Sequence, residues 1–207
     1  MLSSDLWRHS LAIAEQCRDH PFVQGIASGE LDREAFQHYV AQDAFFLDAF
    51  ARAYGLCAAR TAGLETKRAF EELRRAVEDE LELHGSYAER WDVELAAEPA
   101  AATRAYTDFL LDVASLEPVG HAAAAMAPCM RLYAWLGQQL APIARDTSAY
   151  KEWVDTYASA GFEAHAAKLE GLLDALPVET ESVAAHYSRA MELELAFFDS
   201  AYRSAKS

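Results

Sequence analysis

Apolar residues recur every three or four positions along nearly the whole chain, which is the spacing of one face of an α-helix. No run of β-branched residues alternates with polar ones, so the pattern predicts helices and no strands. Seven helices are expected, each as a separate stretch of this periodicity. Their ranges are 4–18, 32–60, 64–95, 99–115, 119–140, 148–175 and 179–205.

A proline or glycine lies at or beside each break between these ranges, where it favours the end of a helix. Pro21, Gly25 and Gly29 lie in the first gap, which we interpret as a connection. Pro128 is an exception, because it lies inside a helical pattern that we expect it to kink. No internal repeat or change of composition divides the chain, so we expect one all-α domain over residues 1–207.

Asp43 lies at the centre of the most aromatic helical face in the chain. On a helix that turns by about 100° per residue, its neighbours within roughly 60° are Phe36, Tyr39, Phe46, Leu47, Phe50 and Tyr54. An unpaired ionised carboxylate there costs on the order of several kcal/mol. No Arg or Lys shares the face, so we favour a ligand-binding or catalytic role. A structural carboxylate that caps a backbone group or holds an arginine is the alternative.

Glu194 is a second carboxylate within an apolar helical face. Its neighbours on that face are Tyr187, Ala190, Met191, Phe197, Phe198 and Ala201. Burial raises the pKa of a carboxyl, which suits such a group to proton donation near neutral pH. The alternative is a buried salt bridge to another helix.

Cys129 is a third reactive group on an apolar face, next to Leu132 and Tyr133. A free cysteine is commonly buried as a small hydrophobic residue, which is the simpler interpretation. Two features favour a site instead: Pro128 frees a carbonyl one turn back, and the alanine-rich run 121–127 leaves room for a ligand. A thiol in that position would supply a nucleophile.

Three tyrosines, Tyr106, Tyr133 and Tyr157, lie on apolar helical faces. Each alone is typical of a core aromatic, although a buried phenol usually needs a hydrogen-bond partner. If these faces converge with those of the two carboxylates and the thiol, they enclose a pocket suited to a small, flat, polar heterocycle.

The composition and net charge of the chain exclude some classes of binding partner. The chain has 207 residues, with 33 Asp and Glu against 18 Lys and Arg, for a net charge of −15. Nucleic acids and anionic membranes would be repelled, so we expect neither as a partner. Three cysteines without a CxxC pair favour a reducing compartment, with Cys17 and Cys57 as packing residues. We see no signal peptide or membrane span and expect a soluble, cytoplasmic protein.

Common sequence motifs for binding nucleotides or metals are not evident in the sequence. There is no Walker loop, GxGxxG or HExxH, and none of the seven histidines follows a glutamate by three, as di-iron bundles require. Glu80 and His84 have a spacing that could share a metal, whereas His165 has only Glu163 nearby. We expect no metal, and we interpret the acidic run 78–80 as a solvated face.

Six segments, in order along nearly the whole chain, resemble the TenA/THI-4 family, also called thiaminase II. They are HPFVQGIASGEL (20–31), FQHYVAQDAFFLDAFA (36–51), ELELH (80–84), APCMRLYAWLG (127–137), YKEWVDTYASAGF (150–162) and ELELAFFDSAYR (192–203). The resemblance implies a haem-oxygenase-like all-α bundle with a central pocket, assembled as a homotetramer and needing neither metal nor cofactor.

The activity that this resemblance implies is aminopyrimidine hydrolysis in thiamine salvage. The substrate is a small molecule, 4-amino-5-aminomethyl-2-methylpyrimidine, which is converted to the hydroxymethyl pyrimidine and ammonia; the same site can cleave thiamine. By position, Asp43 resembles the family's pyrimidine anchor, Cys129 its nucleophile and Glu194 its proton carrier. The residues that resemble the family's pocket tyrosines are Tyr106, Tyr133 and Tyr157.

Phe46 departs from the family pattern. Many relatives read QDSYYL where this chain reads QDAFFL, so a substrate-binding tyrosine is replaced by a ring that can stack but has no hydroxyl. Two other functions stay open at this point: a di-iron oxidase on the same scaffold, and a non-catalytic pyrimidine-binding or regulatory protein.

Overall fold

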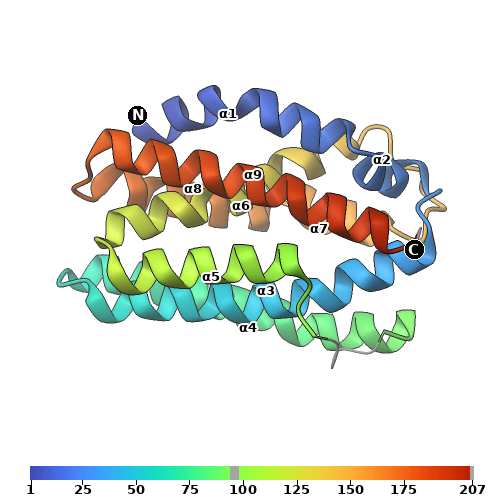
Figure 1. Ribbon diagram of the computed structural model, residues 1–207, viewed down its shortest axis with the longest axis horizontal. Helices are drawn as coiled ribbons and strands as arrows, with labels where there is room; N and C mark the ends of the chain where they lie inside the picture. Colours follow the sequence, from blue (N-terminus) through green and yellow to red (C-terminus); the bar gives the residue numbers. More distant parts are fainter. Residues whose placement is uncertain (94–97, 206–207) are drawn as a thin grey trace.

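The structure, a computed structural model, describes residues 1–93 and 98–205, with the side chains of 82–87 left out. Over these residues the chain forms nine helices and no strand (Figure 1). They are α1 (Leu2–Asp19), α2 (Pro21–Ser28), α3 (Arg33–Arg60), α4 (Leu64–Trp91), α5 (Ala101–Leu116), α6 (Val119–Leu140), α7 (Lys151–Ala158), α8 (Ala160–Ala175) and α9 (Thr180–Ser204). None of the helices described is both long enough and apolar enough to cross a bilayer.

Residues 21–28, expected as a connection, form helix α2 instead. Pro21 occupies the first helical position, where a missing N–H costs nothing. The Nδ1 atom of His20 accepts a hydrogen bond from the Phe22 N–H at 3.1 Å and caps this end. Gly29 ends the helix in the left-handed conformation, with φ 75°. The prediction was wrong because these residues start and stop a short helix.

The single helix expected over 148–175 is two helices, α7 and α8, which meet at Ser159. The backbone of Ser159 is extended, and its hydroxyl accepts from the Phe162 N–H at 3.1 Å, so this serine is the N-cap of α8. The apolar periodicity continues across this break, so the sequence pattern did not predict it. Because of the break, Tyr157 and Phe162 lie on different helices.

The remaining helix ends agree with the prediction within three residues, apart from the end of α4. Helix α4 ends at Trp91, before the expected end at 95, because Asp92 is left-handed (φ 56°) and its N–H closes the last turn. Helix α6 continues through Pro128 without a break. The kink expected there stays a prediction.

Helix α6 lies at the centre of the bundle, packed against α5, α7, α8 and α9. Its run Ala122–Ala125 is fully buried, and these small side chains let the neighbouring helices approach closely. Helices α6 and α9 run in the same direction, because His121 faces His186 near their starts and Cys129 faces Glu194 two turns later (Figure 1).

Gly137 marks the closest approach of α6 to α7, since a Cβ atom here would lie 2.4 Å from the Ala158 nitrogen and the Tyr157 carbonyl carbon. We expect Gly137→Ala to lower the free energy of unfolding by about 1–3 kcal/mol, because the backbone of α7 cannot move aside as a side chain can. Urea titration measures the loss.

The matched control is Gly171→Ala in α8, where a Cβ meets nothing within 4 Å. This change should be neutral or slightly stabilising, because alanine favours a helix over glycine. Equal stabilities for the two variants would contradict the close approach.

Candidate active site

A narrow cavity lies inside the bundle between α3, α4, α6, α7 and α8. Its lining combines aromatic and aliphatic side chains with two carboxylates and a thiol. The lining residues are Asp43, Phe46, Leu47, Phe50, Val77, Glu80, Cys129, Met130, Tyr133, Tyr157 and Phe162. The cavity volume is about 20 Å³, room for about one water molecule, so the lining side chains must move apart to admit a ring. A few polar groups on apolar walls suit a small, flat ligand.

Helix α3 contributes one wall of the cavity. Asp43 is only 4% exposed, and Phe46 and Leu47 lie one turn further along the same face. The Phe46 ring packs against Phe50, at 5.2 Å between centroids, and against Tyr106, at 4.8 Å. These contacts fix the ring that borders the carboxylate.

Helices α6 and α9 place Cys129 against Glu194. The thiol lies beside the carboxyl and interacts with it, and the Tyr106 hydroxyl donates to Glu194 Oε1 at 2.7 Å. Glu194 is 1% exposed and does not line the cavity itself. Cys129, which does, lies between the carboxyl and the cavity. The partners described for this carboxyl are thus a thiol and a phenol, not the cation of a salt bridge.

Burial governs the protonation of this pair. It raises the pKa of Glu194 from 4.5 to about 8, although Tyr106 and Cys129 stabilise the charged carboxylate and oppose the shift. Burial also raises the pKa of the Cys129 thiol well above 9.0, and the nearby carboxylates of Glu194 and Asp43 reinforce this. At pH 7 both groups are mainly protonated. One proton must therefore leave the pair before the sulfur becomes a strong nucleophile.

Tyr133 and Tyr157 form the aromatic wall opposite α3, with their rings edge to face at 4.7 Å. The Tyr133 hydroxyl is 3.4 Å from the hydroxyl of Tyr39, which accepts from Trp153 Nε1 at 3.2 Å. The Tyr157 hydroxyl donates to Glu80 Oε1 at 3.1 Å. Both phenols thus have the partners that burial demands.

The predicted site residues form two groups: one lines the cavity, and the other lies behind the first. Those that line the cavity are Asp43, Phe46, Cys129, Tyr133 and Tyr157. Glu194 lies behind Cys129, and Tyr106 donates a hydrogen bond to Glu194. The chemical roles of all seven stay predictions.

Glu80 and Phe162 are cavity residues that the sequence reasoning missed. The acidic run was expected to be solvated, which holds for Asp79 but is wrong for Glu80, half-buried against Tyr157. The signal was its place three residues after Val77, on the same helical face. Glu80 and Phe162 also line a wider surface pocket, so they lie between the cavity and solvent.

The structure bears differently on the two residue pairs that the sequence offered as possible metal ligands. The side chain of His84 lies outside the described residues, so its pairing with Glu80 is untested. Glu163 binds Arg131 at 2.9 Å, which explains its place near His165 without any metal.

The comparisons with known proteins agree on one family. The TENA/THI-4/PQQC family model matches residues 7–204. An aminopyrimidine aminohydrolase of Halalkalibacterium halodurans is 36% identical over 179 residues, covering 83% of this chain and 80% of that protein. The bifunctional TH2 protein of Arabidopsis thaliana is 36% identical over 206 residues, covering 86% of this chain. The chain spans about a third of the length of that plant protein, 33%.

Solved structures show the same fold. A TenA family transcription regulator from Silicibacter sp. TM1040 superposes with a TM-score of 0.91 at 27% identity, covering 98% of this chain and 96% of that one. Haem oxygenase-1 from Synechocystis sp. PCC6803 superposes with a TM-score of 0.61 at 16% identity, covering 96% and 91%. The second likeness concerns the fold alone, and it confirms the haem-oxygenase-like bundle.

Proposed function

Since the chain belongs to the TENA/THI-4/PQQC family, we propose that it is a thiamine-salvage hydrolase. It converts 4-amino-5-aminomethyl-2-methylpyrimidine and water to the hydroxymethyl pyrimidine and ammonia, and it also cleaves thiamine at the same site. The similarity to the Halalkalibacterium aminohydrolase supports this substrate class. The observation that carries the proposal is the position of Cys129 between the buried carboxyl of Glu194 and a cavity that Asp43 also lines.

Binding comes first. The pyrimidine ring lies between the aromatic side chains of the cavity. Asp43 accepts hydrogen bonds from the pyrimidine's amino group and from a ring nitrogen that is protonated in the bound form. A buried carboxylate that accepts two such bonds fixes the ring in one orientation. The exocyclic carbon then faces Cys129, behind which Glu194 lies.

The chemical step uses the thiol and the carboxyl in turn. Glu194 first loses its own proton to solvent, and as the sulfur adds to a ring carbon the thiol proton passes to the resulting carboxylate. The exocyclic C–N bond then breaks, and Glu194 returns that proton to the departing amine. Glu194 next takes a proton from water, whose oxygen bonds to the exocyclic carbon. Finally the ring expels the sulfur, which regains its proton from Glu194.

The proposal is tested by incubating the purified protein with the aminomethyl pyrimidine and measuring ammonia and hydroxymethyl pyrimidine. We expect equimolar release without added metal, and release of the thiazole alcohol from thiamine. Binding of the pyrimidine without turnover would instead indicate a non-catalytic regulatory protein. Turnover that requires iron and oxygen would indicate a di-iron oxidase.

Asp43→Asn should weaken the binding of hydroxymethyl pyrimidine by about 10- to 100-fold, because the amide offers one acceptor oxygen and no charge. Isothermal titration calorimetry measures this affinity. The matched control is Asp48→Asn on the same helix, an exposed carboxylate 3.5 Å from Arg52, and it should leave the affinity unchanged. Equal affinities for the two variants would defeat the anchoring role.

The homotetramer and the cytoplasmic location are further parts of this proposal. Light scattering on the purified protein tests the first, and fractionation of cells that express the chain tests the second.

A further inference from the structure

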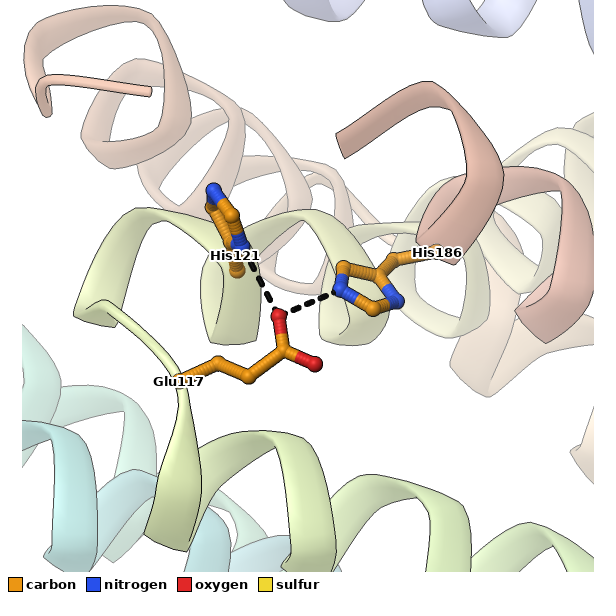
Figure 2. Close-up of side chains that lie close together, drawn as sticks. All are labelled: Glu117, His121 and His186. Carbon is orange, nitrogen blue, oxygen red and sulfur yellow. Dashed lines mark hydrogen bonds and ion pairs between the residues drawn. The ribbon is translucent and has the colours of Figure 1, made fainter. Parts of the chain in front are cut away.

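A second group of titratable side chains lies outside the cavity, where α5 ends and α6 and α9 begin (Figure 2). Glu117 follows the last residue of α5, His121 lies in the first turn of α6, and His186 lies in the second turn of α9. One oxygen of Glu117, Oε2, lies 2.8 Å from His121 Nδ1 and 2.7 Å from His186 Nε2. Three helices therefore aim one carboxylate and two imidazoles at a single point.

This cluster is separate from the proposed active site. His121 precedes Cys129 by eight residues, and His186 precedes Glu194 by eight. At 1.5 Å per residue, both intervals correspond to about 12 Å along the helices. None of the three side chains lines the cavity, and the proposed mechanism uses none of them.

We propose that Glu117, His121 and His186 bind a divalent transition-metal ion of the zinc class. Two imidazole nitrogens and one carboxylate oxygen are a common ligand set for zinc, with water in the fourth position. The three ligand atoms all lie within 4.8 Å of one another. Tetrahedral zinc needs its ligands about 3.3 Å apart, so each side chain has to move by only about 1 Å.

The surroundings hold the ligands in place and leave the site accessible. The His186 ring packs between Phe109, at 6.0 Å, and the His121 ring, at 5.5 Å. The His121 and His186 side chains are 10% and 18% exposed, while the Glu117 side chain is 37% exposed. An ion and its bound water can therefore enter from the side of the carboxylate, between rings that are already oriented.

Metal binding at this point would connect the ends of three helices that also carry residues of the proposed active site. Helices α5, α6 and α9 also carry Tyr106, Cys129 and Glu194, which lie together at the inner wall of the cavity. An ion that binds only the folded chain stabilises it by mass action. The proposed consequence is thus higher stability, and it does not depend on the proposed enzymatic function.

The test uses the untagged full chain, freed of metal by chelation and titrated with zinc chloride in a calorimeter. We expect one ion per chain, with micromolar or tighter affinity, and a rise in Tm of about 5–10 °C at a hundredfold excess over Kd. Cobalt(II) in place of zinc should give the absorption spectrum of a four-coordinate ion.

Variants locate the ion. Glu117→Gln and His186→Ala should each weaken binding at least tenfold, whereas His9→Ala, an exposed histidine on α1, should not. Cys129→Ser should also retain binding, which separates this cluster from the thiol and carboxylates of the cavity. Circular dichroism shows whether each variant folds.

Crystals of the unmodified chain soaked in zinc chloride provide a test that needs no variant. Anomalous scattering between the three side chains would support the proposal. Zinc found elsewhere, binding unaffected by the Glu117 and His186 changes, or no binding by the unmodified chain would each overturn it. The three residues would then form only a hydrogen-bonded contact between helices.

Discussion

Cys129→Ser should lower kcat for ammonia release by on the order of 10³-fold or more, because a hydroxyl is a far weaker nucleophile than a thiol near neutral pH. Serine has nearly the same size, so the bundle should fold and bind hydroxymethyl pyrimidine with unchanged affinity. Steady-state kinetics and calorimetry on the same preparation separate these two effects.

The control for this variant is Cys57→Ser. Cys57 is also fully buried, on α3, but it does not line the cavity. Its replacement should change kcat by no more than a few-fold, whatever its cost in stability. If Cys129→Ser kept the turnover of the unmodified chain, Cys129 could not be the nucleophile, and a direct attack of water would be the better mechanism.

Glu194→Gln should lower kcat by about 10²- to 10⁴-fold, the usual contribution of a positioned acid or base, with little effect on pyrimidine affinity. Glutamine keeps the oxygen that accepts from Tyr106. It cannot take a proton from Cys129 or return one to the departing amine. A change confined to binding would contradict the proton-transfer role.

The same variant should alter how stability depends on pH. The pKa of Glu194 is about 8 in the folded chain and 4.5 ordinarily, so the folded state keeps a proton that the unfolded state loses between these values. The unmodified chain therefore loses stability as pH rises from about 4.5 to about 8. Glu194→Gln removes this loss and should be the more stable protein near pH 9.

Thermal unfolding of both proteins near pH 5 and near pH 9 measures this difference. The gap in Tm should widen with pH and level off above about pH 8. The control is Glu192→Gln, an exposed residue of the same helix paired with Arg189 at 3.0 Å, which should show no such trend. A constant gap for Glu194→Gln would show that burial does not hold its proton.

The sequence predicted those site residues that are polar or reactive while their neighbours on the same helical face are apolar. Asp43, Glu194 and Cys129 are reactive groups among apolar neighbours, so periodicity alone identifies them. Glu80 was missed because acidic residues flank it, and the pattern there resembles a solvated face. Phe162 was missed because the break at Ser159 depends on a side-chain cap within an uninterrupted apolar pattern.

Convergence of the faces could not be predicted from periodicity. It depends on how the helices pack, for example on the contact of Gly137 with the backbone of α7, and these distances have no local sequence signal. The metal motifs considered in the sequence lay within single helices. Glu117, His121 and His186 come from two helices and the residue after a third, so a search by spacing overlooked them.

The matching eight-residue intervals on α6 and α9 limit how this chain can change length during evolution. An insertion or deletion of one residue between His121 and Cys129 would swing the sulfur by about 100° around the helix, away from Glu194. The same holds between His186 and Glu194. Homologues should therefore gain or lose residues at the connections between helices and keep these two intervals free of gaps, which an alignment can check.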